Sequence, residues 1–155
     1  MSTRDTLVTP ADEVNPLLTA DDVMTAAPRT CSKFSTVVEA VLIFQDADCG
    51  LVPVVDGGKP IGVLTDRDVA LALADYKDAL PAMLVGDLMK QGIATVPSDA
   101  RLDVVCRTFA ERGVRRVLVV DDGEQLVGVI SWANLAPHMS ERGLGGLVRQ
   151  VVEQP

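Results

Sequence analysis

A hydroxyl residue followed three positions later by a carboxylate or an amide occurs twice in the chain. Thr65 precedes Asp68 and Ser131 precedes Asn134, each where a strand-like run gives way to a helical pattern. Residues at i and i+3 share a helix face, so the two polar groups of a pair point the same way. A carboxylate accepts hydrogen bonds from the vicinal hydroxyls of a ribose, while a hydroxyl and the free N–H groups of a helix start suit a phosphate. The first pair therefore predicts a site for a sugar and a phosphate.

The same spacing also has a purely structural interpretation. Thr-x-x-Asp at a helix start resembles a capping box, which stabilises a helix by about 0.5–2 kcal/mol and binds no ligand. The two roles are compatible, and both stay open. In the second pair, Asn134 replaces the carboxylate and could bond a ribose hydroxyl only without the help of a charge. Trp132, beside that pair, either stacks on a base or packs in the protein.

Two adjacent arginines, Arg115 and Arg116, stand at the start of a predicted strand near the second pair. A guanidinium there could reach a phosphate across a cleft. Alternatively, the two side chains pair with surface carboxylates, which contributes little to stability. Both interpretations remain open.

The remaining reactive residues do not indicate an enzyme. The chain has one histidine, His138, and no serine or cysteine in a recognisable nucleophile setting beside it. Its cysteines are far apart and form no Cys-x-x-Cys pair, so we expect no zinc site. No glycine-rich phosphate loop follows a strand. We therefore expect neither catalysis nor an obligatory cofactor.

Composition restricts the partners and the compartment. With 14 basic and 22 acidic residues, the formal net charge of −8 argues against binding to nucleic acid or an anionic membrane. A 48% hydrophobic content with 3% aromatic residues predicts a folded chain with an aliphatic core. No apolar run approaches the roughly 18 residues of a membrane span, and no leader follows Met1. With an odd number of cysteines, we expect a cytoplasmic protein.

The chain contains an internal repeat. Asp22-Val23-Met24 recurs 65 positions later as Asp87-Leu88-Met89. Beyond a turn rich in Gly and Asp the spacing becomes 66, so that Gly62 corresponds to Gly128. An inserted residue costs least in such a turn. The sequence thus predicts two copies of one structural unit.

Each copy is predicted to have the order β-α-β-β-α. Apolar spacing and turn residues predict helices over 36–46 and 101–112, strands over 51–55 and 117–120, return strands over 61–64 and 127–130, and second helices from Asp66 and Trp132. One copy is too small to close a core, so two should share one. Pro53 lies within the first of these strands, which suggests an edge or a first position.

The first long helix is apolar almost all round. Within residues 37–45 only Glu39 and Gln45 are polar, which is typical of a helix buried on more than one side. We expect the second side to meet another copy of the chain in a homodimer. A central helix in a monomer is the alternative.

These motifs resemble a known family. The string Gly50-Leu51-Val52-Pro53-Val54-Val55-Asp56, then Gly62-Val63-Leu64-Thr65-Asp66-Arg67-Asp68, resembles the CBS domain, named after cystathionine β-synthase. Residues 114–121 and 128–131 are similar, so the chain looks like a tandem pair of CBS domains, a Bateman module. On this basis we expect a tail over 1–18, a first domain over 19–80, a second over 81–140 and an extension over 141–155.

The resemblance implies an α/β (α+β) fold in which two CBS repeats pack about a pseudo-twofold axis. It also implies a regulatory module that binds an adenosine-containing nucleotide in a cleft between the repeats, dimerises through the repeat helices and is read by an effector protein. Thr65 and Asp68 carry the family's binding roles, and Thr30, Thr95 and Val96 are pocket-wall residues by resemblance only. The alternative is a dimerisation or partner-docking protein with degenerate clefts.

Overall fold

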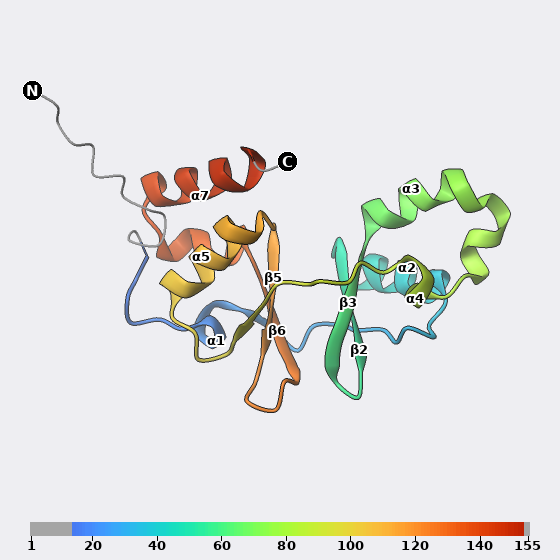
Figure 1. Cartoon of the computed structure of the whole chain (residues 1–155), viewed down its shortest axis with the longest axis horizontal. Coiled ribbons are helices and arrows are strands. Elements are labelled where there is room, and N and C mark those ends of the chain that lie inside the picture. Colours follow the sequence, from blue (N-terminus) through green and yellow to red (C-terminus); the bar gives the residue numbers. More distant parts are fainter. Residues whose placement is uncertain (1–13, 154–155) are drawn as a thin grey trace, which may run out of the picture. The chain divides into compact units, whose positions relative to one another are not determined.

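The structure is a computed structural model that describes residues 14–153 (Figure 1). Helices and strands alternate along the chain, as the sequence predicts. The elements are α1 (Ala20–Val23), β1 (Thr25–Ala26), α2 (Val37–Asp46), β2 (Leu51–Asp56), β3 (Lys59–Thr65), α3 (Asp66–Tyr76), η2 (Lys77–Ala82), α4 (Val85–Leu88), β4 (Thr95–Pro97), α5 (Leu102–Arg112), β5 (Arg116–Val120), β6 (Leu126–Ser131), α6 (Trp132–Leu135), η3 (Ala136–His138) and α7 (Glu141–Glu153). The mixed α+β fold is thereby confirmed.

Local sequence explains these elements well. Thr36 caps α2 by accepting the N–H of Glu39 at 3.3 Å, while the Glu39 carboxylate accepts the Thr36 N–H at 2.9 Å. The tight turn between β2 and β3 contains Gly57 and Gly58 with φ of +58° and +81°, a region that favours glycine. The predicted helices and hairpins are confirmed to within one or two residues at most ends.

The described residues form two compact units. Unit 1 contains residues 14–26, 94–123 and 127–153, and unit 2 contains residues 27–93 and 124–126. The segment that leads the first repeat therefore packs in unit 1, with the hairpin of the second repeat. The segment that leads the second repeat, which includes α4, packs in unit 2 with the hairpin of the first. The two repeats exchange their leading segments.

The strand order is the same in both units. In unit 1 the order is β1-β6-β5-β4, with Thr25 opposite Val129 and the parallel pair β4–β5 at the other edge. In unit 2 the β2–β3 hairpin is flanked by single bridges, from Lys90 to Val63 on one side and from Cys31 to Val54 on the other. These bridges lie at the positions that the 65-residue repeat assigns to β1 and β4.

Pro53 lies in the middle of β2, which has β3 on one side and the single bridge to Cys31 on the other. Its carbonyl accepts the N–H of Cys31 at 3.0 Å, on the side away from β3. The N–H that proline lacks would point to that same side, so the ladder with β3 loses nothing. β2 is effectively an edge strand there, since its other neighbour is a single bridge.

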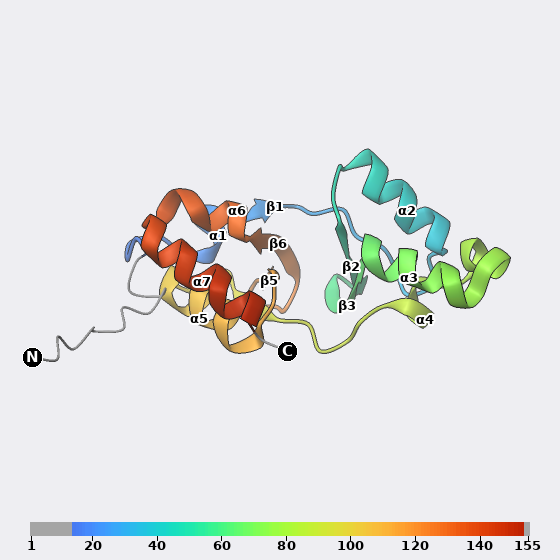
Figure 2. The ribbon, with the colours of Figure 1, turned by 90° about the horizontal axis from the view of Figure 1, so that it is seen from above.

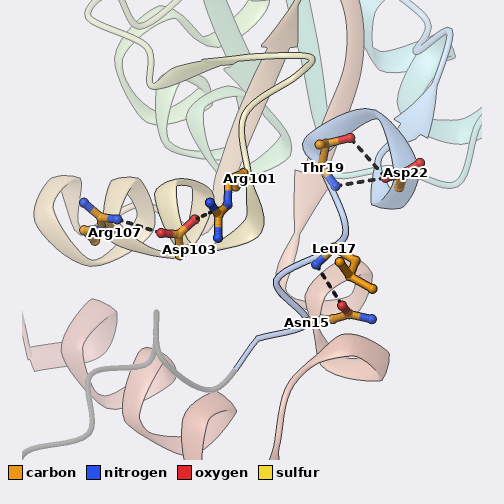
Figure 3. A network of polar contacts seen from close by, with 7 residues as sticks. All are labelled: Asn15, Leu17, Thr19, Asp22, Arg101, Asp103 and Arg107. Atoms are coloured by element: carbon orange, nitrogen blue, oxygen red, sulfur yellow. Dashed lines mark hydrogen bonds and ion pairs between the residues drawn. The ribbon is translucent and has the colours of Figure 1, made fainter.

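The leading segment of the first repeat and the start of α5 each contain local polar contacts (Figure 3). Thr19 pairs with Arg101 in an antiparallel bridge, and the Asp22 carboxylate accepts the N–H and the hydroxyl of Thr19 at 2.9 and 3.0 Å. Asp103 pairs with Arg101 at 3.8 Å and with Arg107 at 2.8 Å along α5. Backbone contacts join the two: besides the Thr19–Arg101 bridge, Ala20 N–H donates to the Ala100 carbonyl at 2.8 Å.

The C-terminal helix α7 lies against α5 (Figures 1 and 2). Its Leu147 and Val151 are buried in the core of unit 1 together with Cys106 and Phe109 of α5. The sequence predicts only an extension over residues 141–155 and no helix there. It completes the core of unit 1.

Helix α2 buries only one of its faces within the chain. Val37, Ala40 and Ile43 are buried, whereas Val38, Val41 and Leu42 are 44, 41 and 50% exposed. The chain itself therefore leaves an apolar face of α2 uncovered. That a second copy covers it stays a prediction.

Candidate functional site

Thr65 and Asp68 meet at the junction of β3 and α3 in unit 2. Thr65 is the last residue of β3 and the N-cap of α3, with φ −109° and ψ 157°. Its Oγ1 accepts the Asp68 N–H at 3.1 Å, and Asp68 Oδ2 accepts the Thr65 N–H at 3.1 Å. The capping box expected from the spacing is therefore present. It also fixes the hydroxyl and the carboxylate side by side.

A third residue, Lys90, joins this pair. Lys90 exchanges two backbone hydrogen bonds with Val63 of β3, at 3.0 and 2.9 Å, which brings its side chain beside the start of α3. Its Nζ lies 3.0 Å from Asp68 Oδ1, and the two side chains are 66 and 11% exposed. Sequence analysis missed Lys90, because only the exchange of leading segments brings it to this place.

These contacts change the acidity of Asp68. Its partial burial alone would raise the pKa of the carboxyl. Hydrogen bonds from Thr65 and Lys90, together with the positive charge of Lys90, act in the opposite sense and outweigh burial, so the pKa lies below its usual value. Asp68 is consequently ionised at neutral pH.

The carboxylate of Asp68 keeps acceptor capacity. An ionised carboxylate offers about four lone-pair positions. Within the described residues, the Thr65 N–H, the Thr65 side chain and Lys90 Nζ all bond to this carboxylate and occupy up to three of them. One position stays open to a hydroxyl donor, and a second opens when the rotatable Thr65 hydroxyl turns to another acceptor. Lys90 likewise has three N–H donors and uses one of them here.

The corresponding pair in unit 1 is arranged differently. Asn134 Oδ1 accepts the Ser131 N–H at 2.8 Å and the Ser131 hydroxyl at 3.0 Å. Its Nδ2 donates to the carbonyl of Val23 at 2.9 Å and to Thr25 Oγ1 at 3.3 Å. The amide therefore uses both of its donors and both acceptor positions inside the protein. Its hydrogen bonds join α6 to the exchanged leading segment.

The two units share one backbone register at this place. Thr25 lies opposite Val129 as Lys90 lies opposite Val63, and Thr25 and Lys90 are 65 positions apart in the repeat. A side chain at Gly62 would place its Cβ 2.8 Å from the Lys90 carbonyl, so glycine is needed for this close approach. The difference between the units thus lies in their side chains: Lys90 with Asp68 in unit 2, Thr25 with Asn134 in unit 1.

The two arginines of the second repeat lie at the start of β5 in unit 1. The Arg115 guanidinium lies over the Trp132 ring, 5.9 Å from its centroid, which is within the range of a cation–π contact. Trp132 is half-buried, as a packing residue would be. Neither Arg115 nor Arg116 forms an ion pair with a carboxylate in residues 14–153.

The three residues named as pocket walls lie in different surroundings. Thr30 is exposed and immediately precedes Cys31, on the side of β2 away from β3. Thr95 is exposed at the start of β4, whereas Val96 is 2% exposed and belongs to the core of unit 1. Thr30 belongs to unit 2, as Thr65 and Asp68 do, whereas Thr95 and Val96 belong to unit 1. They stay predictions.

The cysteines and the histidine take part in no cluster of reactive groups. Cys31 and Cys106 are buried, and burial raises the pKa of their thiols to about 11 and about 12. His138 ends η3, where its carbonyl accepts the Asn15 N–H. Among the described residues, no group of three or more His, Cys, Asp or Glu side chains could hold a metal ion. None of the helices in that part of the chain has the length and apolar character of a membrane span.

Comparison with known proteins accounts for the duplicated architecture. The family model for the CBS domain matches residues 20–75 and again residues 85–141. The chain belongs to the CBS domain family. The resemblance drawn from the two hairpins is thereby confirmed. Proteins built from a CBS pair are typically regulatory rather than catalytic.

Several relatives share this architecture. Hypoxic response protein 1 of Mycobacterium tuberculosis is 29% identical over 137 residues, which cover 87% of this chain and 94% of that protein. The uncharacterized protein MK0525 of Methanopyrus kandleri is 26% identical over 115 residues. That match covers 74% of this CBS chain but 56% of the relative, which is the longer protein.

Solved structures of CBS pairs show the same fold, some with ligands. Hypoxic response protein 1, solved with two coordinated zinc ions, matches 79% of this chain and all of that one, with a TM-score of 0.70 and 28% identity. CBSX2 in complex with AMP matches 77 and 93%, with a TM-score of 0.65 and 25% identity. The CBS pair of protein MJ0100, solved with 5′-methylthioadenosine and S-adenosyl-L-methionine, matches 77 and 98%, with a TM-score of 0.68 and 26% identity.

Proposed function

We propose that this CBS pair is a regulatory module that binds an adenosine-containing ligand at Thr65 and Asp68. The observation that carries the proposal is the Asp68 carboxylate, which is ionised, held by the capping box and left with acceptor capacity beyond its contacts with Thr65 and Lys90 within the described residues. Vicinal ribose hydroxyls can donate to a carboxylate oxygen with such remaining capacity. Complexes of CBSX2 with AMP and of the MJ0100 pair with adenosyl compounds support this ligand class.

The proposed site lies in unit 2, and its counterpart in unit 1 has a structural role. Asn134 could bind a ribose only by giving up hydrogen bonds to Ser131, Val23 or Thr25. Each such bond contributes about 0.5–1.5 kcal/mol, which a ligand there would have to offset. We therefore expect one ligand per chain at the Thr65–Asp68 position.

Regulation requires that the ligand favours one conformation of the protein over another. A ligand shifts such an equilibrium only by its difference in affinity for the two states. We expect an effector protein to bind one of these states. The free thiols of the chain fit the reducing cytoplasm, where adenine nucleotides are available to such a site.

We further propose that two copies associate through α2. Its exposed apolar residues, Val38, Val41 and Leu42, form a face opposite to the buried one. In the equivalent helix of the second repeat, α5, the positions of Val38 and Leu42 are held by Asp103 and Arg107, which form an ion pair at 2.8 Å on the helix surface. Within unit 2, α3 and η2 pack on the buried face of α2, where Ala72 and Leu80 meet Val37. A second copy of α2 would supply the missing apolar partner.

A thermal-shift panel tests the ligand proposal. AMP, ADP, ATP, NADH and S-adenosylmethionine are added to the whole chain, each over a range of concentrations. A ligand at about 100 times its Kd stabilises by about 2.7 kcal/mol. For a chain of this size that corresponds to a rise of about 5–10 °C in Tm. We expect at least one adenine nucleotide to give this response.

Matched variants locate the response. Asp68→Ala should abolish the ligand-induced shift, and Asn134→Ala should reduce it less. Asp66→Asn is the control, because Asp66 lies exposed in the same first turn of α3 and its replacement removes the same charge. A full response in Asp68→Ala would refute the assigned site. A panel without any response would refute ligand sensing and favour a docking module.

A further inference from the structure

We propose that Lys90 determines the charge class of the ligand, so that the site selects an adenosine carrying an anionic group on its 5′ carbon over neutral and cationic adenosyl compounds. The inference rests on the proposed function and assigns a specificity role to a residue of the same site. It starts from the ion pair between Lys90 Nζ and Asp68 Oδ1.

The backbone of Lys90 is fixed, while its side chain is free to turn. Lys90 N–H and carbonyl both pair with Val63, and the adjacent Gly62 leaves no room for a shift of the strand. The side chain, in contrast, is 66% exposed. A lysine side chain has four flexible carbons between Cα and its compact charge. Nζ can therefore turn toward a ligand and remain close to the Asp68 carboxylate. Lys90 can therefore contact a group beyond the ribose that Asp68 binds.

Charge balance decides which group that is. The chain carries a formal net charge of −8, and Asp68 is ionised, so an anion is repelled unless a cation lies beside the site. Lys90 neutralises Asp68 and leaves two of its N–H donors for a ligand. A phosphate uses both the charge and the donors. A neutral thioether uses neither, and a sulfonium is repelled by Nζ.

Unit 1 provides an internal comparison. At the position equivalent to Lys90 it has Thr25, whose hydroxyl accepts a hydrogen bond from Asn134. Neither side chain carries a charge. The cation and the carboxylate thus occur together in unit 2, as a selective site for a phosphorylated ribose requires, and both are replaced together in unit 1.

Isothermal titration of the whole chain with adenosine, AMP and S-adenosylmethionine tests this role. A hydrogen bond to a charged group is stronger than one between neutral groups, but the exposure of Lys90 weakens it toward the lower end of its range. Lys90→Met should therefore weaken AMP binding about tenfold, since 1.4 kcal/mol is a factor of ten. Adenosine affinity should change less than about threefold, and S-adenosylmethionine should bind more tightly than to the native chain.

Two further variants separate charge from structure. Lys90→Arg keeps the charge and should retain most of the preference for AMP over adenosine. Lys59→Met removes the same charge from an exposed lysine at the far end of β3, where it pairs with Glu124 at 3.5 Å. It should leave the preference unchanged.

The outcomes distinguish the two proposals. An equal loss of adenosine and AMP in Lys90→Met would overturn the specificity role while leaving the ligand site standing. An unchanged ratio of the two affinities would overturn it as well. If no adenosyl compound binds the native chain, the proposed function fails and the role of Lys90 fails with it.

Discussion

Replacing Asn134 by aspartate should destabilise unit 1 although the two side chains have almost the same shape. Asn134 Nδ2 donates to the Val23 carbonyl at 2.9 Å and to Thr25 Oγ1 at 3.3 Å. A carboxylate oxygen in that place can accept the Thr25 hydroxyl, which rotates, but it faces the Val23 carbonyl with no proton between them. One hydrogen bond is lost and one buried acceptor is left unpaired, which costs about 2–3 kcal/mol at pH 7.

Urea unfolding measures this cost as a shift of the midpoint at constant slope. Gln150→Glu is the control, because it adds the same charge at an exposed position of α7 in the same unit. Adding Thr25→Lys to Asn134→Asp should return part of the lost stability, because it supplies a cation where unit 2 has Lys90. If Asn134→Asp lowers the free energy of unfolding at pH 7 no more than Gln150→Glu does, the hydrogen bonds of the Asn134 amide do not stabilise unit 1 as inferred.

The pH dependence gives an independent check of the same reasoning. Protonation lets the introduced carboxyl donate to Val23, so its pKa should be higher in the folded than in the unfolded chain. A folded chain that holds the proton more tightly loses stability as pH rises. The deficit relative to the native chain should therefore be complete above the folded pKa and vanish below the unfolded one. A deficit independent of pH would contradict this mechanism.

Three other measurements test separate parts of the structure. The pKa of Asp68 is lower in the folded chain, so the stability that its ionised carboxylate contributes is present above the unfolded pKa and is lost as pH falls through the folded pKa. The free energies of unfolding of the native and Asp68→Asn chains in urea should therefore differ at pH 7 and converge in acid. Leu42→Glu should convert a dimer into a monomer in sedimentation, whereas Val152→Glu, at an exposed apolar position of α7, should not. Gly62→Ala should cost about 1–3 kcal/mol against a backbone carbonyl, while Gly145→Ala, with open space around it in α7, should stabilise by about 0.5–1 kcal/mol in thermal unfolding.

Elements set by nearby residues could be predicted from the sequence. Helix α2 follows from its apolar spacing and the cap at Thr36, and each hairpin follows from a Val-rich strand with Gly or Asp in the turn. Thr65 and Asp68 could be found as a pair because three residues separate them. The spacing predicts both a helix cap and a ligand site. The structure shows the cap, and the cap leaves part of the hydrogen-bonding capacity of the Asp68 carboxylate unused.

Contacts between distant segments could not be predicted in this way. Lys90 meets Asp68 only because the leading segment of the second repeat packs on the first, and Asn134 meets Val23 across 111 positions of sequence. Periodicity contains no information about which copy receives which leading segment. Helix α7 is a different case: Leu144, Leu147 and Val151 follow helical spacing, but three glycines nearby weaken the pattern.

The two units differ by pairs of residues that contact each other, Lys90 with Asp68 in unit 2 and Thr25 with Asn134 in unit 1. This limits which single substitutions either unit tolerates. A carboxylate that is 11% exposed needs a cation or several donors, and a half-buried amide needs acceptors for its two N–H groups. Replacing one member alone leaves a buried polar group without a partner. The backbone register is the same in both units, so the choice between Lys90 with Asp68 and Thr25 with Asn134 is a choice of side-chain chemistry on one framework. Only the first choice leaves acceptors and a charge for an outside molecule, since the second uses all of its hydrogen-bonding groups to hold the exchanged segment.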